Sequence, residues 1–148
     1  MDLVLWRHAD AEEGADDAAR KLTSKGVKQA ERMARWLDEQ LPDDARVLVS
    51  PAARAKETAK PLERKQRVEK SVGSGVSGAQ LLEAAGWPDG KGTVVVVGHQ
   101  PTIGQAVALA LTGTASKWSV KKGAIWWIAS AEGESTPTVR AVLSPDML

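Results

Sequence analysis

Residues 93–101, Thr-Val-Val-Val-Val-Gly-His-Gln-Pro, contain the clearest strand signal of the chain and decide its fold class. A run of β-branched residues that begins after a turn cluster and ends at a glycine is typical of a buried strand. Pro101 can occupy the first turn of a following helix, whose apolar stripe continues to a helix-ending glycine at Gly113. The stretch therefore predicts a buried strand, an abrupt polar end at His99, and a helix directly after it.

The same pattern, an apolar run that ends at polar residues, occurs twice nearer the N-terminus. Residues 3–6 lead into Arg7-His8, and residues 46–50 lead into a helix over about residues 51–61. Short apolar strands that alternate with helices are typical of α/β proteins with a mainly parallel sheet.

The remaining segments complete this succession. Residues 23–42 predict a helix, because apolar residues recur at helical spacing between a Thr-Ser cap and a terminating proline. Residues 80–86 predict a short helix, and the charged segment 63–70 predicts a weak edge strand or a loop. Residues 124–130 and 138–143 predict a hairpin at one side of the sheet. The expected architecture is a three-layer α/β/α sandwich with a mainly parallel, mixed central sheet.

Composition excludes several classes of protein. The chain has 148 residues and no cysteine, which predicts a single domain over residues 1–148 and excludes a disulfide scaffold. A net charge of +1 gives no electrostatic footprint for nucleic acid or an anionic membrane. The apolar runs are too short to span a bilayer, and the N-terminus shows no signal peptide, so a cytoplasmic location is expected.

Both histidines of the chain directly follow predicted buried strands. His8 follows residues 3–6, His99 follows residues 94–97, and Arg54 lies in the first turn of the helix after the third strand. Ligands of open α/β sheets collect beyond the carboxyl ends of the strands, so these side chains and Arg7 are expected to meet. Together with a helix N-terminus opened by Ser50, they are groups that bind an anionic tetrahedral ligand. The sequence therefore predicts a phosphate site built without metal.

Other interpretations of these residues remain open at this point. A histidine at a strand end is often structural, and an isolated arginine such as Arg54 is often a solvated helix charge. His8, His99 and Asp10 could form a two-histidine, one-carboxylate metal site, although the neighbouring guanidiniums would repel a cation. The glycine-rich segment 73–78 lacks the residue order of a P-loop and is predicted to be a turn. No G-x-S-x-G elbow is present, which argues against serine hydrolysis.

Four short motifs of the chain resemble those of one family. They are Leu-Trp-Arg-His-Ala-Asp-Ala at residues 5–11, Arg-Lys-Leu-Thr-Ser-Lys-Gly at 20–26, Val-Leu-Val-Ser-Pro-Ala-Ala-Arg-Ala-Lys-Glu-Thr-Ala at 47–59 and Val-Gly-His-Gln-Pro at 97–101. Their order and spacing resemble the histidine phosphatase (phosphoglycerate mutase-like, or RHG) superfamily, and within it the short phosphohistidine phosphatases of SixA type. Residues 63–92 have little counterpart in this pattern.

The resemblance implies a phosphoglycerate mutase-like fold and a metal-independent phosphatase without a cofactor. The residues that it places around the phosphoryl group are Arg7, His8, Arg54 and His99 as catalytic residues, with Arg20, Ser50 and Gln100 as substrate-binding residues. His8 is expected to become phosphorylated, which divides one displacement into two. The arginines are expected to stabilise the three equatorial oxygens of the transferring group.

Two departures from the family pattern bear on the substrate. The usual glycine after the Arg-His pair is Ala9, a change that SixA-like members tolerate. Larger members place a glutamate proton donor between the two histidines, and here Glu69, Glu83 and Asp10 are candidates by position only. Because phosphohistidine has a better leaving group than a phosphoester, the missing acid points to phosphohistidine on a phosphorelay or carrier protein. A small-molecule phosphomonoesterase and a non-catalytic phosphoprotein-binding module are the alternatives, and the oligomeric state is left open.

Overall fold

The computed structural model describes residues 1–148 and is built around one six-stranded mixed sheet. The strands are β1 (Asp2–Arg7), β2 (Arg46–Val49), β3 (Gln66–Val68), β4 (Thr93–Gly98), β5 (Ile125–Ala129) and β6 (Thr138–Leu143). Their order across the sheet is β3-β2-β4-β1-β5-β6. The first four run parallel, whereas β5 and β6 form the antiparallel part. The mainly parallel mixed sheet expected from the sequence is confirmed.

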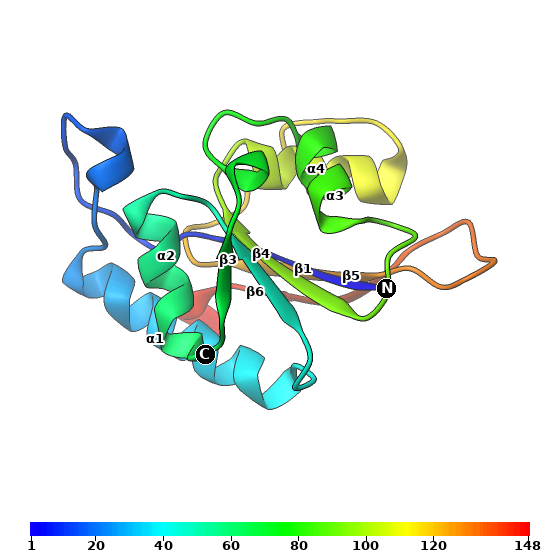
Figure 1. Cartoon of the computed structure of the whole chain (residues 1–148), viewed down its shortest axis with the longest axis horizontal. Coiled ribbons are helices and arrows are strands. Elements are labelled where there is room, and N and C mark those ends of the chain that lie inside the picture. Colours follow the sequence, from blue (N-terminus) through cyan, green and yellow to red (C-terminus); the bar gives the residue numbers. More distant parts are fainter.

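Helices cover both faces of this sheet, as Figure 1 shows. They are α1 (Ser24–Gln40), α2 (Ala53–Ala59), α3 (Gly78–Ala85) and α4 (Thr102–Thr112). Helices α1 and α2 lie on one face and α3 and α4 on the other (Figure 1), so the molecule has the three layers of an α/β/α sandwich. No helix is both long and apolar enough to cross a bilayer.

Alternating side chains of the central strands build two separate cores. In β1, Leu3 and Leu5 face the core under α3 and α4, whereas Val4 and Trp6 face the core under α1 and α2. Strand β4 divides its four valines between the two cores in the same way. All of these side chains are almost completely buried. This explains why the strands read as continuous apolar runs and not as an alternating pattern.

Local sequence explains most of the observed element ends. The Thr23 hydroxyl accepts a hydrogen bond from the Gly26 amide and caps α1, as predicted. Gly113, with φ of 80°, ends α4 in the left-handed conformation that favours glycine. The hairpin of β5 and β6 and the short edge strand β3 are confirmed.

The helix after β2 differs from its prediction. It was expected over residues 51–61 with Ser50 as its cap, but α2 covers only Ala53–Ala59 and is followed by a 3-10 turn, Lys60–Leu62. Ala52 occupies the N-cap position and has no side-chain acceptor, while the Ser50 hydroxyl accepts from the Ala52 amide and from His99. The serine-proline pair that is typical of a helix start therefore does not begin this helix.

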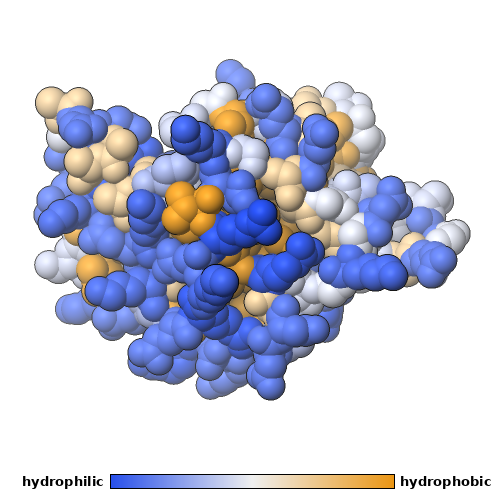
Figure 2. Space-filling model, in the orientation of Figure 1, coloured by the Kyte–Doolittle hydropathy of each residue, from blue (hydrophilic) through white to orange (hydrophobic).

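The register of the parallel strands brings their carboxyl ends to one level. Arg7 of β1 pairs with Gly98 of β4, and the amide of His8 donates to the Gly98 carbonyl at 2.9 Å. The Ser50 amide, after β2, donates to the Val97 carbonyl at 3.0 Å. The residues that follow three neighbouring strands are thus held at one edge of the sheet. The face of the molecule drawn in Figure 2 is mainly hydrophilic, with small separate apolar areas.

Candidate active site

A pocket of about 210 Å³ lies at the carboxyl ends of β1, β2 and β4. Its nine lining residues come from six different segments of the chain: Arg7, His8, Ala11, Arg20, Arg54, Ser74, His99, Gln100 and Lys122. The predicted meeting of both histidines with Arg7 and Arg54 is therefore present in the structure. The lining holds four side chains of cationic type and no carboxylate, so the pocket suits an anion.

His8 presents one ring nitrogen to the pocket and uses the other to fix its orientation. Nδ1 lies 2.8 Å from the Ala9 carbonyl oxygen, which can only accept a hydrogen bond. Nδ1 therefore carries the proton, and Nε2 keeps a lone pair. The Arg54 Nε–H donates to this Nε2 at 3.3 Å. Burial, together with nearby Arg54 and Arg7, lowers the pKa of His8 to about 4, so the imidazole is neutral at pH 7.

The alanine that replaces the usual glycine after His8 does not intrude on the pocket. Ala9 is completely buried and packs in a small cluster with Leu22 and Ala30. Its amide donates to the Thr58 hydroxyl at 3.0 Å, and Thr58 donates to the Arg54 carbonyl at 2.7 Å. The backbone that orients His8 is thus tied to α2, and the extra methyl group points into the core.

His99 is also neutral, and both of its ring nitrogens have partners. Its Nδ1 lies 3.3 Å from the Arg54 Nη2, which can only donate, so Nδ1 accepts. Nε2 therefore carries the proton and donates to the Ser50 hydroxyl at 2.7 Å. Burial and then the positive charge of Arg54 lower the pKa of His99 to about 4. The ring centroids of the two histidines are 5.2 Å apart. His99 is therefore an acceptor toward the pocket in this state, and donation to a phosphoryl oxygen requires that it gain a proton.

Arg7 contributes a guanidinium whose hydrogen-bond donors are only partly paired within the protein. Its Nη1 donates to the Val120 carbonyl at 2.7 Å, but its Nε is buried and has no hydrogen-bond partner. Burial also lowers the pKa of Arg7. A buried donor without an acceptor costs on the order of 1–3 kcal/mol.

Arg20 lines the pocket as the resemblance implied, and two polar residues of the lining, Ser74 and Lys122, were missed by the sequence analysis. Lys122 comes from the irregular segment between α4 and β5, where no hydrophobic periodicity marks a position. Ser74 belongs to the glycine-rich turn, which borders the pocket although it lacks the order of a P-loop. Proximity to Gly73 and Gly75 was the one sequence signal for Ser74, and nothing comparable marked Lys122.

The structure places Ser50 and Gln100 in supporting positions. Ser50 is 1% exposed and does not line the pocket, so its predicted contact with substrate is replaced by a contact with His99 from behind. Gln100 reaches the pocket edge, but both ends of its amide are used internally. Its Nε2 donates to the Trp118 carbonyl at 2.8 Å, and its Oε1 accepts from the Gly104 amide at 2.7 Å. Gln100 thereby ties the start of α4 to the segment that carries Lys122.

None of the three carboxylates considered as proton donors lines the pocket. Glu69 is paired with Arg67 at 2.7 Å, and Glu83 is exposed on α3. Asp10 bonds to Lys122 and to the Thr23 hydroxyl, and these two contacts hold its pKa below the ordinary value. Asp10 therefore stays ionised near neutral pH and does not join the histidines in a metal-ligand triad.

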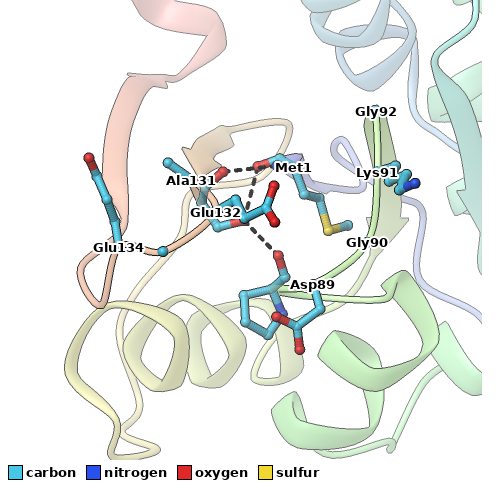
Figure 3. A pocket seen from close by; sticks show the side chains of 11 residues that line it. Met1, Asp89, Gly90, Lys91, Gly92, Ala131, Glu132 and Glu134 are labelled. Carbon is cyan, nitrogen blue, oxygen red and sulfur yellow. Dashed lines mark hydrogen bonds between the residues drawn. The ribbon is translucent and has the colours of Figure 1, made fainter.

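A larger cavity of about 620 Å³ lies at the opposite end of the sheet, beside the amino ends of β1 and β4. Figure 3 shows it between Met1, Asp89 and Glu132. The amine of Met1 donates to the Ser130 carbonyl, and the Ser130 hydroxyl donates to the Pro88 carbonyl. This cavity contains no histidine or arginine, and its carboxylates oppose an anion. The smaller pocket is therefore the one with reactive groups.

Comparisons with known proteins agree with the site. The model of the histidine phosphatase superfamily (branch 1) matches residues 3–76. The phosphohistidine phosphatase SixA of Escherichia coli K12 is 32% identical over 117 residues, which cover 73% of each chain. The structure of the protein histidine phosphatase SixA complexed with tungstate has a TM-score of 0.79, 28% identity and 99% coverage of both chains.

A more distant likeness shows the fold alone. A phosphoserine phosphatase of Entamoeba histolytica has a TM-score of 0.75 at 18% identity, with 99% of this chain and 98% of that chain covered. The family, as distinct from the fold, is shown by two matches: the family model matches half of the chain, and SixA is 32% identical. The chain belongs to branch 1 of the histidine phosphatase superfamily, is a SixA-type member of it, and has the phosphoglycerate mutase-like α/β fold of that group.

Proposed function

We propose that this phosphatase removes the phosphoryl group from phosphohistidine on another protein, through a phosphorylated His8. The carrying observation is that the Nε2 lone pair of His8 faces a small cationic pocket whose lining holds no carboxylate. SixA of Escherichia coli bears the name of a phosphohistidine phosphatase. A phosphorelay or carrier protein is the kind of partner that presents such a side chain.

In the first step, His8 Nε2 attacks phosphorus in line with the bond to the substrate nitrogen. A new N–P bond forms at Nε2, the substrate N–P bond breaks, and its electron pair returns to the substrate imidazole. His8 needs no base, because its pKa of about 4 leaves Nε2 unprotonated at neutral pH. The Arg54 Nε–H moves from Nε2 to a phosphoryl oxygen, where it joins Arg7 in stabilising the transferring group.

In the second step, water attacks the phosphorus of phospho-His8. The bond between phosphorus and Nε2 breaks, Nε2 regains its lone pair, and the oxygen of water leaves as part of inorganic phosphate. The protons of the water stay on that phosphate or pass to solvent. Nδ1 of His8 keeps its proton throughout, because the Ala9 carbonyl holds it.

The absence of a carboxylate from the pocket lining favours phosphohistidine over a phosphoester. An alkoxide leaving group benefits from a general acid, whereas a phosphohistidine protonated on its other ring nitrogen leaves as neutral imidazole. Asp10, Glu69 and Glu83 all lie outside the lining. The pocket of about 210 Å³ has room for one phosphoryl group with the end of a side chain, and little room for a bulky phosphoester.

The test is phosphate release from a phosphohistidine-bearing protein and from a panel of phosphomonoesters, measured side by side in EDTA. We expect fast release from phosphohistidine and its loss in His8→Ala. Samples denatured in alkali, in which a phosphorylated histidine survives, should show phosphate on a histidine of the wild-type chain and none on the variant. Preference for small esters would assign a phosphomonoesterase instead, and binding of the phosphoprotein without turnover would assign a binding module.

A further inference from the structure

One exposed carboxylate outside the pocket lining contacts two arginines of the pocket. Asp17 lies on a 3-10 turn, Asp17–Ala19, in the segment that follows β1, and its side chain is 61% exposed. Its Oδ2 accepts from Arg54 Nη2 at 3.2 Å, and its Oδ1 accepts from Arg20 Nη1 at 3.2 Å. The Asp17 carbonyl oxygen also accepts from Arg54 Nη1 at 2.7 Å. A surface turn thus holds a guanidinium whose residue is only 4% exposed.

The contacts of Arg54 divide between two edges of its planar guanidinium. The edge formed by Nε and Nη2 faces the reaction site, with Nε 3.3 Å from His8 Nε2 and Nη2 3.3 Å from His99 Nδ1. The end formed by Nη1 and Nη2 faces away and is held by the carbonyl and the carboxylate of Asp17. Because the fork is planar and rigid, holding its outer end fixes the direction of its inner edge.

We propose that Asp17 is a positioning residue, which grips the outer end of Arg54 so that the inner edge is aimed at a phosphoryl group on His8. This inference rests on the proposed function for the reaction but not for anion binding. The same carboxylate steadies Arg20, whose Nε also donates to the Glu12 carbonyl at 2.7 Å. Two groups outside the pocket lining, the Asp17 carboxylate and the Glu12 carbonyl, therefore hold the pocket arginines Arg54 and Arg20.

Positioning and simple charge have opposite consequences here, which makes the inference testable. Removing a negative charge beside an anion site makes the site more positive, and by charge alone anions bind more tightly. Removing the contact between the Asp17 carboxylate and Arg54 lets the guanidinium rotate, so anions bind more weakly and turnover falls. The neighbouring Asp16 provides a matched control, because it is exposed on the same turn and its side chain makes no capping hydrogen bond.

The experiment compares Asp17→Asn, Asp17→Ala and Asp16→Asn with the wild type. Tungstate binding is measured by calorimetry, and kcat and KM are measured on a phosphohistidine protein. We expect Asp17→Ala to bind tungstate and to turn over on the order of tenfold less well, as small displacements of aligned groups do. Asp17→Asn should lose less, because it keeps one side-chain acceptor, and Asp16→Asn should stay within about twofold of the wild type.

A double-mutant cycle with Arg54→Lys shows whether Asp17 acts through Arg54. Lysine has no second edge to orient, so the effect of Asp17→Ala on tungstate affinity should shrink in that background to the part that acts through Arg20. Tighter or unchanged tungstate binding in Asp17→Ala, or an equal loss in both backgrounds, would overturn the inference. If the wild type binds tungstate but does not hydrolyse phosphohistidine, the proposed function fails while the binding cycle still decides the role of Asp17. If the wild type does not bind tungstate, both fail.

Discussion

Replacing Ser50 by alanine removes the hydroxyl that holds the second histidine of the site. The Ser50 oxygen accepts from His99 Nε2 at 2.7 Å and from the Ala52 amide at 3.2 Å, and all three groups are buried. Without it, the His99 N–H faces a position with no acceptor. The other neutral tautomer does not help, because its Nδ1–H would point at the donor Nη2 of Arg54. Every neutral form of His99 in Ser50→Ala therefore leaves one buried group unsatisfied.

The size of the effect follows from that unsatisfied group. A buried donor that loses its acceptor costs about 1–3 kcal/mol of the free energy of unfolding. For a chain of this length, each kcal/mol corresponds to a shift in Tm of roughly 2–4 °C. If this cost is present in the transition state and not in the bound substrate complex, kcat falls by roughly 5- to 150-fold. KM should change little, since Ser50 does not line the pocket.

Ser130→Ala is the matched control for this substitution. Its hydroxyl donates to the Pro88 carbonyl at 2.7 Å, beside the larger cavity at the far end of the sheet. Both variants should be less stable in urea denaturation, but only Ser50→Ala should lose kcat on phosphohistidine. Equal kcat in Ser50→Ala and Ser130→Ala would show that Ser50 does not orient His99 for the reaction, and the argument from tautomers would be wrong.

Three further variants or conditions test the site. Arg54→Ala should reduce kcat by about 10²–10³, as the loss of a preorganised charge-stabilising donor does. Arg64→Ala removes a half-buried arginine that is paired with the exposed Asp38 and lies outside the pocket lining, so it should leave turnover unchanged in the same assay. The free energy of unfolding should fall as pH is lowered from about 6.5 to about 4, because the unfolded chain takes up protons at His8 and His99 while the folded chain holds their pKa near 4. Urea titrations across this range should show a weaker pH dependence of this free energy in His8→Ala. An identical pH dependence in the variant and the wild type would contradict the lowered pKa of His8. Gln100→Ala should lower Tm through the loss of two partly buried hydrogen bonds, at about 1 kcal/mol each, and a Tm equal to that of the wild type would show that these contacts are not formed in solution.

The sequence was sufficient to predict the residues that follow strands. His8, His99 and Arg54 were found because each comes directly after an apolar run or opens the next helix, and a parallel sheet fixes where such positions meet. The strands themselves were recognisable because burial on both faces requires continuous apolar residues, as in Val94–Val97. The mainly parallel character of the sheet and the antiparallel hairpin at one side also followed from the pattern of segment types, whereas the order of the strands did not.

Contacts made by irregular segments were not predictable in this way. Lys122 and Asp17 reach the pocket region from loops, where neither period 2 nor period 3.6 relates sequence position to direction in space. The position of Ser50 was predicted at the right strand end, but its direction was wrong. The side chain of a residue after a strand can point into the pocket or away from it. Ser50 points away from the pocket lining, where its hydroxyl accepts the hydrogen bond of the His99 N–H.

The lowered pKa values explain why this site is suited to nucleophilic attack and to release of phosphate. With no anion bound, burial and then the cationic neighbours of His8 and His99 favour the neutral imidazoles, and a neutral His8 is the form that attacks phosphorus in the proposed reaction. Entry of a phosphoryl group compensates those cations, so the pKa of His99 must rise while the anion is present. His99 can then take up a proton at Nδ1 and donate it as a hydrogen bond to a phosphoryl oxygen, and when phosphate leaves the same cations expel that proton. Calorimetry of tungstate binding in buffers of different ionisation enthalpy should therefore detect proton uptake near neutral pH, and binding without proton uptake would show that His99 stays an acceptor throughout.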